Sequence, residues 1–151
     1  MPVEKKKQPQ PQPDEPRAAL TLYVAGRLRS HELFLLGVSV LTGGAYVAGT
    51  PPAASLAATL PLWQIRIWSA ALLLSGLLGI TGIVWQHYRV EFGLSLEQAS
   101  MLIGAGAILL FCMAAFSYAG LRALAGGLVY AAWAGANLHR AWQIRRDLAG
   151  L

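Results

Sequence analysis

The chain has 151 residues, of which 56% are hydrophobic and only 13% are charged, and its formal net charge is +5. Soluble domains contain about a quarter charged residues, so this composition excludes an ordinary soluble globular domain and indicates a membrane protein. A basic chain of this kind is attracted to the anionic inner leaflet of a membrane, and we therefore expect lipid and no nucleic acid as its partner.

The first 31 residues differ in character from everything that follows. Residues 5–17 read KKKQPQPQPDEPR, a polar and proline-rich stretch that is unable to bury a hydrophobic core. We predict a disordered tail over 1–17, held near lipid by its lysines. Residues 18–31 mix apolar residues with two arginines, and we expect this segment to lie in the membrane interface.

The remaining chain is dominated by long blocks without a charged residue: 33–65, 67–86, 98–121 and 123–138. About 20 apolar residues suffice for a helix to cross the hydrocarbon layer. No block shows the alternation of apolar and polar residues that is typical of a strand in a membrane β-barrel. Because backbone groups must be paired within lipid, these blocks predict helices. We expect an all-α transmembrane domain over 32–147, with four spanning helices at about 32–49, 62–88, 96–119 and 121–147.

Local signals set the ends of these helices. The first must stop before Pro51-Pro52, and the second begins after Pro61, since proline is tolerated only at the start of a helix. The stretch SLEQ, 95–98, fits a capping box and predicts the start of the third helix. A very short turn at Gly120 then leads into the fourth helix.

Basic residues are distributed unequally between the two sides of this arrangement. Ten of the 12 lysines and arginines fall on the side of the two termini, and only Arg66 and Arg122 fall on the other. The positive-inside rule therefore places both termini in the cytoplasm. Tryptophans and arginines near the helix ends are expected at the membrane interfaces. They are Trp63, Arg66, Trp68, Trp85, Arg122, Arg140, Trp142, Arg145 and Arg146.

No catalytic, nucleotide-binding or metal-binding motif is present in the sequence, so we expect a protein that is not an enzyme and holds no cofactor. Carboxylates deep in a helix bundle often mark transporters. We place Glu32 at the start of the first helix and Glu97 at the inner loop, which argues against transport. His31, His87 and His139 are expected at one depth near the inner face. They are weak candidates for a metal or haem site, because their spacing fits no known ligand motif.

Small residues recur at helical spacing and predict close contacts between helices. On the fourth helix they are Ala123, Gly127, Ala131 and Gly135, and on the second they are Ser75, Gly79 and Gly82. Such faces serve packing within one chain or self-association between chains. We expect the fourth-helix face to pack within the chain, against Gly104 and Ala107 of the third helix.

The stretches GLSLEQASMLIGAGAILL (93–110) and AAWAGANLHRAWQIRRDL (131–148) resemble segments of small four-helix membrane proteins of phages and prophages of high-GC Gram-positive bacteria. The resemblance covers about 63–148 and implies a bacterial cytoplasmic membrane. It adds a holin-like, pore-forming lysis protein as one alternative. The interpretation we favour is a non-catalytic membrane protein that acts through helix contacts with itself or with a partner, and a small transporter is the third.

Overall fold

A computed structural model of the chain describes residues 30–149 and consists, over that range, of helices without any strand. The elements are α2 (Ser30–Val47), α3 (Ala54–Thr59), α4 (Leu62–Trp85), α5 (Val90–Ala119), the 3-10 turn η1 (Gly120–Ala123) and α6 (Leu124–Ala149). The prediction of an all-α fold is thus confirmed over this range. The expected tail over 1–17 and all but the last two residues of the expected interfacial segment lie outside the described range.

Two helical stretches are long and apolar enough to cross a membrane. One is α4, and the other is Val90–Ala149, which η1 folds back on itself to give α5 and α6. The apolar helix at the start of the described range, His31–Val47, is shorter than these two stretches.

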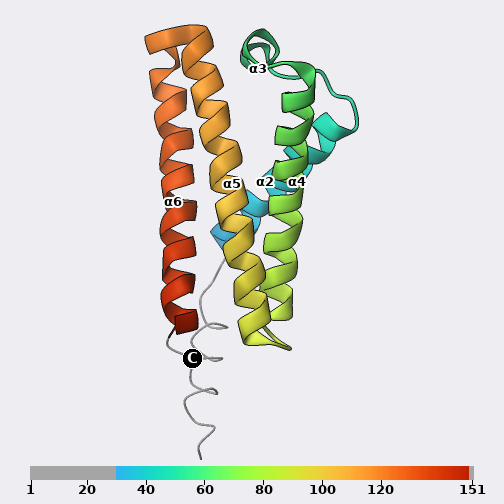
Figure 1. Cartoon of the computed structure of the whole chain (residues 1–151), viewed down its shortest axis with the longest axis vertical. Helices are drawn as coiled ribbons and strands as arrows, with labels where there is room; N and C mark the ends of the chain where they lie inside the picture. The colour runs from blue at the N-terminus through green and yellow to red at the C-terminus, as the bar shows by residue number, and fades with distance from the viewer. Residues whose placement is uncertain (1–29, 150–151) are drawn as a thin grey trace, which may run out of the picture.

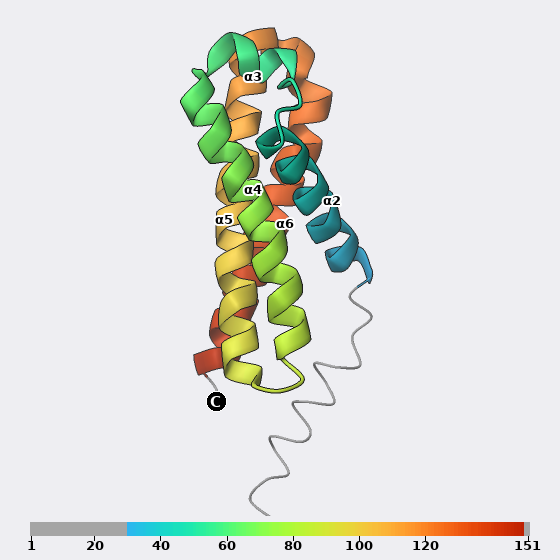
Figure 2. The same ribbon diagram turned by 90° about the vertical axis from the view of Figure 1, so that its right-hand side faces the viewer.

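The helices pack against one another in chain order. Helix α2 packs on α4, α4 packs on α5, and α5 packs on α6, while the short α3 lies against α5 at one end (Figure 1). Figure 2 shows that α2 crosses α4 obliquely, whereas α4 and α5 run side by side over most of their length. Helix α2 packs on α4 and α6 packs on α5, and no comparably close packing joins α2 to α6.

The observed helix boundaries differ from prediction most at the start of α5. This helix begins at Val90 behind an extended Arg89, so SLEQ lies inside the helix and does not cap it. The Ser95 hydroxyl donates instead to the Glu91 carbonyl, one turn back, at 2.8 Å. Buried Gly93 and Leu94 explain the difference, because contacts with α4 favour a further turn and a half of helix.

Two of the three reversals of the chain, after α2 and after α5, use glycine where the backbone enters the left-handed region. Gly49 has a φ of 101° and ends the turn after α2, just before Pro51 and Pro52. Gly120 has a φ of 56° and joins α5 to η1. Only glycine adopts such angles without steric cost, so both reversals are encoded locally. Between the first of them and α4, the expected loop contains the short helix α3.

Close helix contacts occur where glycines face a neighbouring backbone. A Cβ on Gly43 of α2 would come within 2.4 Å of the Leu73 backbone nitrogen on α4. A Cβ on Gly82 of α4 would come within 2.8 Å of the Glu97 backbone nitrogen on α5. Between these points, Ser75 and Ser100 donate their hydroxyls to each other's carbonyl oxygens, at 2.9 and 2.7 Å. Glycine and serine thus bring α2, α4 and α5 into direct backbone contact.

Candidate functional site: an aromatic cavity beside a buried ion pair

The most deeply buried charged group of the described residues is the carboxylate of Glu97 on α5, which has no exposed surface. Its Oε1 accepts from Arg140 of α6, with Nη2 at 2.7 Å and Nε at 2.9 Å. Its Oε2 accepts from the Gln86 amide at the end of α4. Glu32 of α2 adds a longer ion pair, with its Oε1 3.5 Å from Arg140 Nε. Side chains from or beside all four long helices therefore meet at one charged cluster.

This cluster corrects two expectations. Glu97 lies within a helix and is buried, although we expected it at the inner loop. The bundle therefore does contain a buried carboxylate, and its absence can no longer be used as an argument against transport. Arg140 is not an exposed interface residue, because its side chain is only 11% exposed and turns inward to two carboxylates. One signal in the sequence was missed: Gly93, Glu97, Ser100 and Gly104 recur at helical spacing, and all four are buried. Small residues at this spacing are typical of a packed helix face, and Glu97 lies within it.

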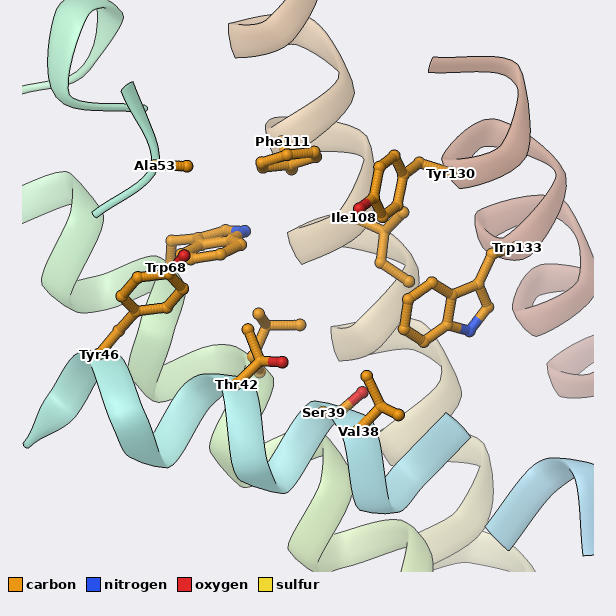
Figure 3. Close-up of a pocket in the computed structure, with 11 residues that line it drawn as sticks. Val38, Ser39, Thr42, Tyr46, Ala53, Trp68, Ile108, Phe111, Tyr130 and Trp133 are labelled. Atoms are coloured by element: carbon orange, nitrogen blue, oxygen red, sulfur yellow. The ribbon is translucent and has the colours of Figure 1, made fainter. Parts of the chain in front are cut away.

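A cavity of about 260 Å³ opens between α2 and α6, above this charged cluster. Thr42 and Tyr46 of α2 form one side and Tyr130 and Trp133 of α6 the other, as Figure 3 shows. The back wall comes from α4 and α5 and includes Trp68. The remaining lining residues are Val38, Ser39, Ala53, Leu72, Ile108 and Phe111. The lining is mainly apolar with a few hydroxyl groups, which is the usual character of a small-molecule site.

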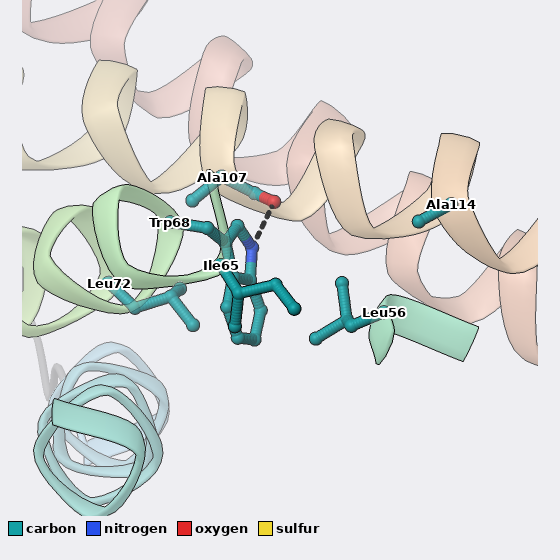
Figure 4. Close-up of a cluster of buried hydrophobic side chains, with 6 residues drawn as sticks. All are labelled: Leu56, Ile65, Trp68, Leu72, Ala107 and Ala114. Atoms are coloured by element: carbon teal, nitrogen blue, oxygen red, sulfur yellow. Dashed lines mark hydrogen bonds between the residues drawn. The ribbon is translucent and has the colours of Figure 1, made fainter. Parts of the chain in front are cut away.

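Trp68 is held rigidly in that wall. Its side chain is 5% exposed, and its indole Nε1 donates to the Ala107 carbonyl of α5 at 2.8 Å (Figure 4). Around it pack Leu56 of α3, Ile65 and Leu72 of α4, and Ala114 of α5. The expectation of an interfacial Trp68 therefore does not hold. The indole is buried because its nitrogen donates a hydrogen bond to a carbonyl and its ring packs between α4 and α5.

The aromatic cavity continues into a second, more polar space of about 130 Å³ towards the charged cluster. Ser39 and Trp133 line both spaces, so the two adjoin. The polar space is lined by His31 and Glu32 of α2 and by Asn137 and Arg140 of α6, with Ser75 of α4 between them. The aromatic cavity and the polar space thus adjoin each other between α2 and α6.

The other expected interface residues lie on the surface. Trp63 and Arg66 are exposed on the first turns of α4, and Arg122 is exposed in η1. Trp85 is exposed at the end of α4 and packs against Phe92. On the last turns of α6, Trp142, Arg145 and Arg146 are exposed, and the Arg146 guanidinium lies 4.3 Å from the centre of the Trp142 ring.

The three histidines are not brought together into a ligand set. His31, His87 and His139 are all exposed, and His139 lies 3.0 Å from the Gln143 amide on its own helix. Among residues 30–149, no group of three or more histidine, cysteine, aspartate or glutamate side chains is arranged to hold a metal ion. His31 is the one of these histidines that lines the polar space next to Glu32.

The two small-residue faces have different environments. Ser75, Gly79 and Gly82 of α4 are buried at the contacts with α2 and α5. In the other face only Gly127 is buried, where a Cβ would come within 2.6 Å of the Phe116 ring, and Ala123, the last residue of η1, is half-buried. Ala131 and Gly135 are exposed. The expected packing of that whole face against α5 is therefore wrong, because Ala134 of α6 packs against Ala105 and Ile108 of α5 instead, and Ala141 packs against Met101.

No protein-family model, curated protein or solved structure matches the chain.

Proposed function

We propose that the chain is a multi-pass protein of a bacterial cytoplasmic membrane, crossed by α2, α4, α5 and α6, with both termini in the cytoplasm. The apolar lengths of α4, α5 and α6 support this, and α2, with 18 residues, is about 27 Å long, close to the hydrocarbon thickness. Large apolar side chains are exposed on each of these helices, including Leu41, Ile67, Met113 and Val129. Lipid is the environment in which such side chains are stable without a partner.

Labelling of single cysteines from outside tests this topology. In a Cys112→Ala background, Ala54→Cys lies on the proposed outer side, and Tyr88→Cys lies in the proposed inner turn. Both native residues are exposed, so both new thiols will be accessible to reagent from their own side. A membrane-impermeant maleimide on intact cells should label the first variant only, and cell lysis should expose the second. Labelling of the Tyr88→Cys variant in intact cells would reverse the orientation.

We propose further that the protein is non-catalytic and acts by binding a small, partly apolar molecule in the aromatic cavity. The observation that carries this proposal is the cavity itself, which has rigid aromatic walls and adjoins a charged space. A void of this size in a packed helix domain costs dispersion contacts, and a ligand restores them. The buried Glu97–Arg140 pair supports the proposal, because ionisable groups inside membrane domains are costly and usually serve a function.

Binding of a neutral aromatic probe tests the cavity. Tert-butylbenzene should raise the melting temperature of the purified full chain in phosphatidylcholine nanodiscs, because a ligand that binds only the folded state stabilises it. The Thr42→Phe variant fills the cavity and should lose this shift. Leu41→Phe is the matched control, since the neighbouring Leu41 is 75% exposed and does not line the cavity. Equal shifts in both variants, or no shift in the parent chain, would refute binding in this cavity.

A second candidate function is self-assembly, as a holin-like lysis protein of a phage or prophage would require. The observation in its favour is the exposed part of the small-residue face on α6. Ala131 and Gly135 lie on the surface, and a Cβ on Gly135 would meet no atom within 4 Å. Small exposed residues allow close approach of a helix from another copy. Cross-linking of wild-type protein and an Ala131→Leu variant in membranes tests this candidate.

A further inference from the structure

One side chain that lines the polar space has hydrogen-bonding groups that the protein does not use. Asn137 of α6 is half-buried, and no hydrogen bond joins its side-chain amide to any other residue of the described range 30–149. Its Nδ2 lies beside Gly104 of α5, 3.3 Å from where a Cβ on that glycine would be. A primary amide carries two donors and an acceptor, and leaving them unpaired inside a membrane domain is costly. Asn137 is therefore placed to bind a group that enters the polar space.

The other polar groups around this space have partners in the protein or are open to water. The Ser39 and Ser75 hydroxyls donate to carbonyl oxygens of the helices, at 3.1 and 2.9 Å. His31 is exposed in the first turn of α2, where water can bond to its ring. Arg140 and Glu32 line the space together and lie 3.5 Å apart, so the lining offers charges of both signs. It therefore selects neither a cation nor an anion, and the neutral amide is the group left to select a guest.

The amide lies close to the aromatic cavity along α6. Asn137 comes four residues after Trp133, which extends from the helix into that cavity (Figure 3). Trp133 lines both spaces, and Asn137 lines the polar one. Four residues of helix span about 6 Å, roughly the length of a benzene ring with one substituent. A guest whose ring lies beside Trp133 thus has its substituent level with the Asn137 amide.

We propose that the two adjoining spaces bind a neutral primary carboxamide with an aryl or short alkyl body. This inference rests on the proposed function, because it names the class of ligand for the same cavity. The N–H of the ligand donates to the Asn137 carbonyl oxygen, and the carbonyl oxygen of the ligand accepts from the Asn137 amide. A ketone would leave the Asn137 oxygen unpaired, and a hydrocarbon would leave both groups unpaired, so the site discriminates against both.

Two neutral probes of the same shape test this inference. Benzamide has the proposed head group, and in α-methylstyrene a methylene and a methyl group take the places of its oxygen and nitrogen. Each probe is titrated calorimetrically into the full chain in phosphatidylcholine nanodiscs, with empty nanodiscs as the blank. The partitioning of a probe into lipid is the same for every variant, so each affinity is compared between variants and not between probes.

Three substitutions separate the head group from the body of the ligand. Asn137→Leu keeps the size of the side chain and should weaken benzamide about tenfold, the ratio that one or two neutral hydrogen bonds supply, while α-methylstyrene is unchanged. Gln143→Leu is the matched control, because it removes an amide of the same helix that lines neither space, and it should change neither affinity. Thr42→Phe fills the aromatic cavity and should weaken both probes.

The amide can also be observed directly, because Asn137 is the only asparagine in the chain. Protein labelled with a nitrogen isotope at asparagine alone gives a single pair of side-chain amide signals in its NMR spectrum. Benzamide should move this pair to lower field, as a hydrogen bond to a carbonyl does, and α-methylstyrene, which carries the same ring, should not. This measurement uses the unaltered chain, so it answers the question even if Asn137→Leu does not fold.

The outcomes distinguish the carboxamide inference from the proposed function. If Asn137→Leu leaves benzamide binding unchanged, or weakens both probes equally, the carboxamide inference is overturned. The same holds if the parent chain binds α-methylstyrene but not benzamide, or if benzamide does not move the Asn137 signals. Binding in the cavity still stands in each of these cases, provided that Thr42→Phe weakens whichever probe binds. Binding of neither probe to a folded parent chain overturns the proposed function as well.

Discussion

Arg140 of α6 and Glu97 of α5 form a buried ion pair, with Nη2 and Oε1 2.7 Å apart. The carboxylate has no exposed surface and accepts a further hydrogen bond from Gln86. A buried pair of this kind gains little over a well-packed apolar pair, because both charges lose their hydration. Removal of Glu97 is more costly, since Arg140 then loses its two shortest contacts and keeps the longer one with Glu32. The pair therefore fixes how α5 and α6 are aligned.

Loss of one partner should accordingly destabilise the protein. We expect Glu97→Ala to lower the free energy of unfolding by about 3 kcal/mol, the lower end of the usual cost of breaking a buried ion pair, because Arg140 keeps its longer contact with Glu32. Thermal unfolding in detergent, followed by circular dichroism, measures the effect. Glu91→Ala is the matched control on the first turn of the same helix, where the side chain is exposed, and it should change stability by less than about 0.5 kcal/mol.

A double substitution separates the charge from the packing. Glu97→Leu combined with Arg140→Met replaces the pair by apolar side chains and should recover most of the stability that Glu97→Leu alone loses. A double variant no more stable than the single one would mean that the hydrogen bond from Gln86, rather than the ion pair, holds α5 in place.

The sequence predicted the long helices well because their signals are local. These signals act within one or two helical turns: the length of the uncharged blocks, Pro51-Pro52, Pro61 and Gly120. The observed bounds of α4 and α6 lie within three residues of the predicted ones. The start of α5 was missed because it depends on contacts of Gly93 with α4, which no local pattern reports.

The candidate site was not predicted, for a related reason. Tyr46, Trp68 and Tyr130 are far apart in the sequence and read there as separate aromatic residues, and only the packing of α2, α4 and α6 places them around one cavity. Trp68 was assigned to the interface by its position near a helix end, a rule that does not say which way a side chain faces. Its distant partner, the Ala107 carbonyl, decides that instead.

The crossing of α2 and α4 should depend on Gly43. An added Cβ would lie 2.4 Å from the Leu73 backbone nitrogen, and backbone cannot move aside as a flexible side chain does. We expect Gly43→Ala to destabilise the chain by about 1–3 kcal/mol, the range typical of overpacking. The same thermal unfolding assay applies.

Gly37→Ala is the control for this prediction on the same helix. No atom lies within 4 Å of the Cβ it would add, so alanine should be neutral or stabilising by about 0.5–1 kcal/mol, through its better helix propensity. Equal effects of the two substitutions would show that α2 does not approach α4 closely in solution.

Trp68 should contribute through its indole nitrogen as well as its ring. Trp68→Phe keeps an aromatic side chain but removes the donor to the Ala107 carbonyl and part of the ring volume, so we expect a loss of about 1–3 kcal/mol. Trp63→Phe, at a side chain that is 60% exposed, should have little effect. Both are measured by thermal unfolding, and a Trp63 variant as unstable as the Trp68 variant would contradict the assignment of Trp68 to the core.

The last prediction separates packing within the chain from assembly between chains, using two residues of one helix. Gly127→Leu forces a side chain into the Phe116 ring, 2.6 Å from the added Cβ, and should lower the melting temperature and the folded yield. Ala131→Leu, one turn along, adds apolar surface at an exposed position that lipid tolerates, and it should leave the melting temperature of the monomer unchanged.

The effect of Ala131→Leu on cross-linking then decides the role of the exposed face. If copies associate through it, the larger side chain keeps their helices apart, so cross-linked oligomers in membranes should decrease while the protein stays folded. Any growth arrest on overexpression should decrease in parallel, as a pore-forming assembly requires. Unchanged cross-linking would remove the support for a holin-like function, because Ala131 and Gly135 would then face only lipid. A large drop in melting temperature would contradict the exposed position of Ala131 on α6 itself.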